Sequence, residues 1–170
     1  MTQILKALDF AKQKHAGQKR KGSGDDYVTH TIAVSYIVAA YKRSKRIDDL
    51  LIASLLHDTL EDTDTTFAEL AVTFNPLVAS LVLELTNDTD AIKKVGKLEY
   101  QKKKMQGMSS YGLVIKLADR LHNVSDQPKM QMILDTLDLM KYLAANRKLT
   151  KTQKLLVTEI NTICGAAIAV

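Results

Sequence analysis

Apolar residues recur along this chain at the three- and four-residue spacing of an amphipathic helix. Ile4, Leu5, Leu8 and Ala11 predict a first helix over residues 2–16. We expect further helices over residues 29–43, 47–62, 110–124, 130–146 and 151–168, and a lysine-rich helix over residues 97–106. No segment shows sustained strand alternation flanked by turn signals. Because only seven glycines and two prolines interrupt 170 residues, the pattern predicts an all-α chain.

Local signals predict where two shorter helices begin. Thr66-Phe67-Ala68-Glu69 has the pattern of a capping box. Asn75-Pro76 predicts the start of the next helix, since proline suits the first helical turn. We expect a loop over Asn87 to Lys93. With no linker composition anywhere and enough residues for one core, the chain is predicted to form a single domain over residues 1–170.

One histidine and three carboxylates lie together at the end of the helix predicted over residues 47–62. An apolar run, Leu50 to Leu56, leads directly into His57-Asp58-Thr59-Leu60-Glu61-Asp62. In a continuous helix His57 lies above Glu61, and Asp58 above Asp62. Burying these carboxylates at a helix C-terminus is costly unless a cation compensates them. A divalent metal ion is the obvious cation, and a solvated acidic helix end with a chance histidine is the alternative.

Two other segments supply the ligands that this stretch lacks. His30 stands at the start of an apolar helix, and Asp119 stands inside another. The four candidates, His30, His57, Asp58 and Asp119, form a mixed nitrogen and oxygen set. That set suits Mn²⁺ or Fe²⁺ and leaves Zn²⁺ open.

Each added ligand also has an ordinary structural explanation. His30 alone is compatible with a core or capping residue, and Asp119 alone could pair with Lys116 or Arg120. His122 ranks below the other candidates, because Asn123 is the residue one turn from Asp119.

The order of histidine, His-Asp and aspartate resembles that of the HD-domain metal-dependent phosphohydrolases. Four segments resemble, more closely, the hydrolase half of the RelA/SpoT alarmone enzymes, a pattern shared by small alarmone hydrolases and metazoan SpoT homologues. They are Gln18-Lys19-Arg20-Lys21, Tyr27-Val28-Thr29-His30, His57 to Thr63, and Lys116 to Asn123. Glu84-Leu85-Thr86-Asn87-Asp88 is also similar to the family's Glu-Val-Thr-Asp-Asp. The resemblance extends from about residue 3 to about residue 165.

This resemblance implies an HD-domain helical bundle with a central metal site. It implies hydrolysis of the 3′-pyrophosphate of (p)ppGpp to GDP or GTP and pyrophosphate, with one Mn²⁺ as cofactor. The implied ligands are the four candidates already selected. Glu61 and Asp62 are implied to position and deprotonate the attacking water.

The resemblance also assigns residues to the nucleotide. Arg20 and Lys21 match the loop that lies against guanine, where a planar guanidinium can stack on the base. Asn123 resembles a substrate-contacting asparagine, and Lys93 and Tyr142 fall where the family holds phosphates and sugar. The chain departs from the family's pattern at three positions, Thr31, Ser125 and Asp138. These departures leave the metal ligands intact. They affect the expected 5′-phosphate contacts, so the exact substrate stays open.

Net charge favours an anionic partner. The chain carries 24 basic and 19 acidic residues, with the excess in Lys12 to Lys21 and Lys93 to Lys104. Solvated helix faces are the other explanation of these lysines. Six tyrosines, three phenylalanines and no tryptophan are not interleaved with the lysines, which argues against a nucleic-acid stacking platform.

Three further expectations concern compartment and assembly. The only cysteine, Cys164, cannot form an internal disulfide, which fits a reducing cytoplasm. No signal-peptide pattern and no apolar run of ~20 residues is present, so we do not expect a membrane partner. Whether the chain forms a homo-oligomer stays open.

Two alternatives to (p)ppGpp hydrolysis remain. One is an HD-domain phosphohydrolase acting on another nucleotide, such as NADPH or a 5′-nucleotide. The other is a non-catalytic, basic module that binds nucleotide or nucleic acid.

Overall fold

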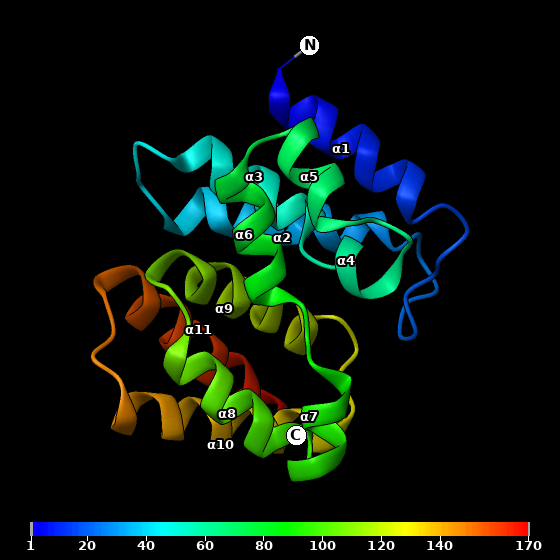
Figure 1. Ribbon diagram of the computed structural model, residues 1–170. Helices are drawn as coiled ribbons and strands as arrows, with labels where there is room; N and C mark the ends of the chain where they lie inside the picture. Colours follow the sequence, from blue (N-terminus) through cyan, green and yellow to red (C-terminus); the bar gives the residue numbers. More distant parts are fainter. Residues whose placement is uncertain (1, 170) are drawn as a thin grey trace. The chain divides into compact units, whose positions relative to one another are not determined.

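The computed structural model describes residues 2–169, and over that range the chain is built of α-helices without β-strands (Figure 1). The predicted all-α class is confirmed. The chain divides into two compact units, Met1–Thr86 and Asn87–Val170. The first holds α1 (Gln3–Lys14), α2 (Val28–Tyr41), α3 (Ile47–Leu56), α4 (Thr59–Asp62), α5 (Phe67–Thr73) and α6 (Pro76–Leu85). The second holds α7 (Thr89–Val95), α8 (Lys97–Gly107), α9 (Ser110–Ser125), α10 (Met130–Asn146) and α11 (Lys151–Ile168).

The first unit is organised around α3. This helix packs against α1, α2 and α6, and α5 packs on α6 (Figure 1). A helix with neighbours on several sides has to be apolar around most of its circumference. Accordingly every residue in the second half of α3, from Ile52 to Leu56, is buried. The site residues that follow α3 therefore start from a firmly packed element.

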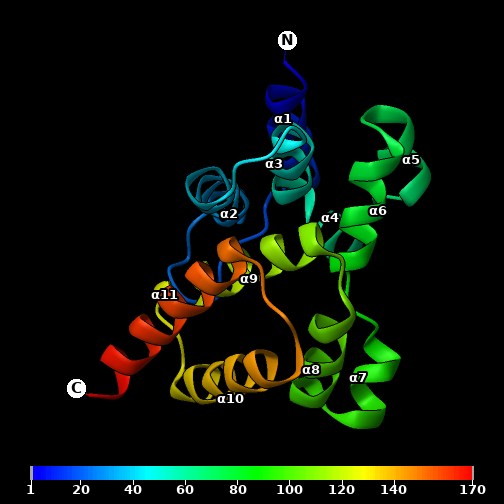
Figure 2. The same ribbon diagram turned by 90° about the vertical axis from the view of Figure 1, so that its left-hand side faces the viewer.

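The second unit has α9 as its most buried helix. It packs against α11 and α10, while α8 packs against α10 and α7 (Figure 2). Residues 112–119 of α9 are all buried, and that stretch includes the charged side chains of Lys116 and Asp119. The ends 1 and 170 of the predicted single domain lie outside the described residues.

The continuous helix predicted over residues 47–62 is wrong, because the structure has two helices separated at His57 and Asp58. Side chains compete here for backbone carbonyls. His57 Nδ1 bonds the carbonyl oxygen of Ser54 at 2.8 Å, and the Thr59 hydroxyl donates to the carbonyl of Leu56 at 2.7 Å. The Asp62 N–H still donates to the Asp58 carbonyl at 2.9 Å. Asp58 and Asp62 thus remain one turn apart.

The loop expected over Asn87 to Lys93 is also wrong in part, because α7 begins at Thr89. Its start is an N-cap in which Asp88 accepts hydrogen bonds from the backbone N–H groups of Asp90 and Ala91. The capping box of Thr66 and Glu69 and the helix starting at Pro76 are confirmed. Within residues 2–169, no helix is long and apolar enough to cross a bilayer.

Candidate active site

His57 is held in a single orientation by the backbone of its own helix. Its ring is 1% exposed, and Nδ1 lies 2.8 Å from the carbonyl oxygen of Ser54. A carbonyl only accepts, so Nδ1 carries a hydrogen, and in the neutral ring Nε2 is then the nitrogen that can bind a metal ion. Metal-binding histidines are typically oriented by such a bond to a backbone carbonyl.

Asp58 brings a carboxylate to both buried histidines. Its Oδ2 lies 2.9 Å from Nε2 of His57 and 3.6 Å from Nε2 of His30. The two imidazole rings are 5.1 Å apart between centroids, and each offers a nitrogen within 4.8 Å of the other. A lone pair and a carboxylate oxygen at 2.9 Å repel each other unless a proton or a metal ion lies between them. The first unit therefore brings together three of the four predicted ligands, in a donor set suited to a divalent metal.

Tyr27 holds the same carboxylate oxygen of Asp58. Its hydroxyl donates to Oδ2 of Asp58 at 2.6 Å, and its ring meets the His30 ring nearly edge-on, with centroids 5.6 Å apart. Sequence reasoning gave this residue no role, although it begins the segment Tyr27-Val28-Thr29-His30. Its position three residues before a candidate ligand was the available signal.

Asp62 lies at the end of α4, in surroundings that favour its protonated form. Burial is the largest cause raising the pKa of this carboxyl, followed by the charges of Asp58 and Glu61. His15 and Tyr27 act in the opposite direction and lower the pKa. A carboxylate with a raised pKa is a stronger general base than an ordinary one, so the position suits proton transfer.

We expect Asp62→Asn to raise the melting temperature of the metal-free protein at about pH 7. A raised folded-state pKa means that the stability from the bound proton is present below the ordinary value of 3.8 and is lost as pH rises through the folded pKa. Asparagine cannot ionise, so the variant avoids that loss. Thermal unfolding in EDTA, at about pH 7 and near pH 3, should show the gain only at the higher pH.

Asp64→Asn is the matched control. Lys14 bonds Asp64 at 2.9 Å and lowers the pKa of its carboxyl. Its stabilisation is therefore present above the ordinary pKa and lost as pH falls, the opposite sign. A gain at about pH 7 in this variant, or none in Asp62→Asn, would contradict the account.

Asp119, the fourth predicted ligand, belongs to the second unit. It is 6% exposed; Oδ2 accepts a hydrogen bond from Lys116 Nζ at 3.0 Å, and Oδ1 accepts one from Asn123 Nδ2 at 2.5 Å. The structure thus contains the pairing with Lys116 that was the alternative explanation. Its role as a ligand stays a prediction.

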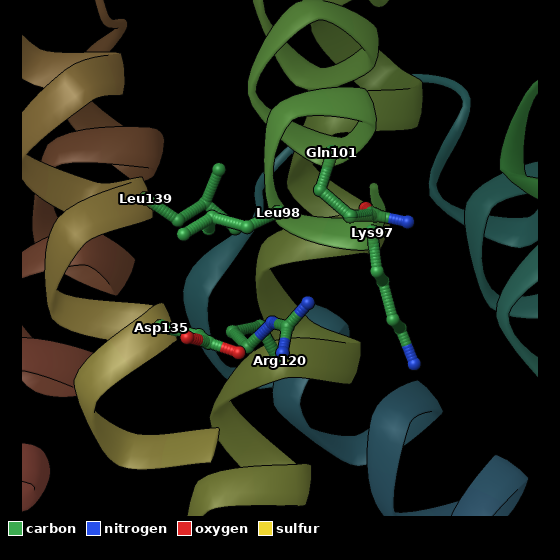
Figure 3. A pocket seen from close by; sticks show the side chains of 6 residues that line it. All are labelled: Lys97, Leu98, Gln101, Arg120, Asp135 and Leu139. Carbon is green, nitrogen blue, oxygen red and sulfur yellow. The ribbon is translucent and has the colours of Figure 1, made fainter. Parts of the chain in front are cut away.

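Arg120, the other alternative partner, extends into a hollow of the second unit, where its side chain and that of Asp135 point toward one another (Figure 3). The hollow has a volume of about 30 Å³. That is room for about one water molecule, so it is not a nucleotide site. A second hollow, in the first unit between α1, α2 and α3, has about 400 Å³. Its lining is apolar apart from Ser35 and Tyr36 and carries no cation, which makes it unsuited to phosphates.

The predicted guanine-binding loop contacts Tyr27 through the side chain of Arg20. Arg20 exchanges backbone hydrogen bonds with Asp25 and Gly24, at 2.8 and 3.0 Å. Its guanidinium carbon lies 5.8 Å from the centroid of the Tyr27 ring, and Lys21 is exposed. The structure therefore brings the Arg20 side chain to the same tyrosine that holds Asp58.

The remaining predicted substrate residues lie in the second unit. Lys93 is exposed and pairs with Asp90 at 3.0 Å. The hydroxyl of Tyr142 donates to Oε1 of Gln106 at 2.7 Å and accepts from Lys103 at 3.2 Å. Asn123 bonds Asp119. Each has a structural partner, and the substrate roles stay predictions.

Comparison with known proteins places these residues in a family. A family model described as an HD domain matches residues 7–149. Human MESH1, named a guanosine-3′,5′-bis(diphosphate) 3′-pyrophosphohydrolase, is 39% identical over 127 residues, covering 73% of this chain and 69% of that protein. A protein of the same enzyme name from Aquifex aeolicus is 37% identical over 131 residues, 72% of this chain but 17% of the longer relative.

A solved structure extends the comparison to the fold. It is that of a metazoan ortholog of SpoT, described as hydrolysing ppGpp and playing a role in starvation responses. The match has a TM-score of 0.78 and 29% sequence identity, and it covers 94% of both chains. The predicted resemblance is confirmed: this chain belongs to the HD-domain family, among the MESH1 and SpoT-like ppGpp hydrolases.

Proposed function

We propose that the protein hydrolyses the 3′-pyrophosphate of (p)ppGpp, releasing pyrophosphate and GDP or GTP. The observation that carries the proposal is the group formed by His30, His57 and Asp58, with the Asp62 carboxyl one helical turn further on. Relatives at 35–41% identity named as this enzyme support it. A protein that only binds nucleotide would need neither a set of metal donors nor, close to it, a carboxyl suited to act as a general base.

The proposed metal ion is Mn²⁺, bound by His30, His57, Asp58 and Asp119. The mixed imidazole and carboxylate set supports Mn²⁺, and the family's motif supports Asp119. When bound, a divalent ion supplies Lewis-acid polarisation of a phosphoryl oxygen and makes water more acidic. The family model spans both compact units, which supports one functional domain over residues 1–170.

The chain's own side chains divide the remaining work. The Asp62 carboxylate accepts a proton from the attacking water, and Glu61 helps to orient that water. Tyr27 holds the Asp58 carboxylate by its 2.6 Å hydrogen bond, and Ser54 holds the tautomer of His57. These contacts keep the donors in place before substrate arrives, so reorganisation during the reaction is small.

Five further side chains are proposed to contact the nucleotide. Arg20 and Lys21 lie against guanine, while Asn123, Lys93 and Tyr142 contact the sugar and phosphates. The net charge of +5 favours so anionic a substrate. A cytoplasmic location is part of the proposal, supported by the buried, unpaired thiol of Cys164.

Arg20→Ala should raise KM for ppGpp about tenfold, equivalent to ~1.4 kcal/mol, and change kcat much less. The reason is that stacking on guanine binds substrate and transition state alike. Steady-state kinetics check this, with Lys19→Ala as the control, because Lys19 pairs with Asp26 at the surface of the same loop. A loss confined to kcat, at unaltered KM, would refute the stacking role.

The test of substrate identity is a comparison of kcat/KM for ppGpp, pppGpp, NADPH and deoxynucleoside 5′-phosphates, using purified Mn²⁺-loaded protein. We expect the two guanosine tetra- and pentaphosphates to be preferred. Faster turnover of NADPH or a 5′-nucleotide would favour the other phosphohydrolase. Absence of turnover on every substrate, in protein shown to contain metal, would favour a binding module.

A further inference from the structure

A chain of hydrogen bonds joins the end of α1 to the end of α4. His15, directly after α1, is 3% exposed, and its Nδ1 lies 2.6 Å from Oε1 of Gln18. Gln18 Nε2 donates to the backbone carbonyl of Asp62 at 2.9 Å. The amide can serve both partners in only one orientation, with its oxygen toward the ring and its nitrogen toward the carbonyl. His15 must then carry hydrogen on Nδ1.

The last acceptor in this series of hydrogen bonds belongs to α4, a helix too short to be stable by itself. α4 spans only Thr59–Asp62, and a single helical turn has little stability of its own. The last carbonyl groups of a helix also lack partners inside the helix. Gln18 supplies the missing donor at Asp62, the residue whose carboxyl is assigned to proton transfer. The position of that carboxyl consequently depends on a contact from outside α4.

His15 reaches the metal donors by a second route. Its ring lies against the Tyr27 ring, with centroids 4.9 Å apart and planes inclined by 32°. Tyr27 in turn donates to Asp58. Among residues 2–169, nothing hydrogen-bonds the buried Nε2 of His15. The hydrogen bond of His15 to Gln18 is therefore made through Nδ1 alone.

We propose that His15 and Gln18 are positioning residues that set where the Asp62 carboxyl lies relative to Asp58. The inference rests on the proposed function, because it takes Asp62 as the proton acceptor. Gln18 fixes the end of α4, and His15 fixes Gln18 while supporting Tyr27. The buried ring of His15 thereby helps to position the Asp62 carboxyl relative to the metal donors. A displacement of ~1 Å at such a site can lower the rate about 10²-fold.

The decisive variants are Gln18→Met and His15→Ala. Gln18→Met keeps the side-chain length and removes both hydrogen bonds, and His15→Ala removes the ring. Both should lower kcat on ppGpp about 100-fold, with KM within about twofold of wild type and metal content unchanged. Gln13→Met is the matched control, since Gln13 is exposed on the preceding turn of α1, and it should retain wild-type kcat.

A conservative substitution separates positioning from folding. His15→Asn keeps an N–H donor near the place of Nδ1, so it should recover at least tenfold of the kcat lost in His15→Ala. Equal loss in both His15 variants, with kcat corrected for metal-loaded protein, would overturn the role of the hydrogen bond.

A readout without substrate separates this inference from the proposed function. In the metal-free protein, ¹⁵N NMR should show His15 protonated at Nδ1. Gln18→Met should shift the amide resonances of residues 59–62, and Gln13→Met should not. Unmoved resonances in Gln18→Met would overturn the positioning role even if wild-type protein hydrolyses ppGpp. Conversely, shifts in a protein that does not hydrolyse ppGpp would contradict the proposed function alone.

Discussion

Replacing Asp62 by asparagine should lower kcat for ppGpp hydrolysis about 10²–10⁴-fold while the protein keeps its metal. The change removes the proton acceptor and preserves the shape of the side chain. Asp62 lies one turn beyond Asp58, and the folded surroundings raise the pKa of its carboxyl, so it combines position with basicity. Steady-state kinetics and elemental analysis on the same sample measure both effects.

Glu61→Gln should also lower kcat with metal retained, because Glu61 shares the one-turn helix and orients the water. Asp64→Asn, two residues beyond Asp62, is the control and should keep normal turnover. Unchanged turnover in both the Asp62 and the Glu61 variant would contradict the mechanism. The Asp62→Asn protein is further expected to be more stable than wild type when metal is absent, the usual trade of stability for activity at such a site.

Replacing His57 by alanine should remove both the metal and the activity. His57 is the donor whose orientation the structure defines best, through Ser54 on one side and Asp58 on the other. Elemental analysis should give about one metal ion per wild-type chain and far less in the variant, with hydrolysis at background. Metal at 100 times its dissociation constant stabilises by ~2.7 kcal/mol, so the melting temperature should rise with Mn²⁺ only in wild type.

His122→Ala is the matched control for the loss of an imidazole. His122 was a fifth candidate ligand that ranked below the others, because Asn123 is the residue one turn from Asp119. The His122→Ala variant should therefore retain stoichiometric metal. A His57→Ala protein that binds metal as wild type does would contradict the assigned centre. Loss of metal from His122→Ala would add a ligand that the account omits.

Helix positions were predictable because residues that face the core recur with the helical period. The apolar periodicity of residues 110–124 and 130–146 appears as α9 and α10 within a residue or two. The break after α3 was not predictable from periodicity. It depends on His57 and Thr59 bonding backbone carbonyls, and those bonds leave no trace in the spacing of apolar residues. Asp88 capped α7 for a similar local reason, inside a segment too polar to register as a helix.

The candidate metal ligands were predictable because histidine and aspartate are residue types that bind metal ions. His57 and Asp58 were selected because burying carboxylates beside an apolar run is costly without a cation, and His30 because it adds a nitrogen ligand to that set. The residues that hold them were not selected. Tyr27 bonds Asp58, and His15 acts on Asp62 only through Gln18. Asp58 and Asp62 are distant from these residues along the chain, so one sequence does not reveal the contacts.

The central claim is that water cleaves the bond between the ribose 3′ oxygen and the pyrophosphate. Phosphorus-31 NMR of ppGpp incubated with Mn²⁺-loaded protein tests it directly, since it identifies every phosphorus-containing product. We expect one pyrophosphate for each GDP, formed at equal rates and without orthophosphate. Orthophosphate as the first product, or ppGpp left intact by metal-loaded protein, would contradict it.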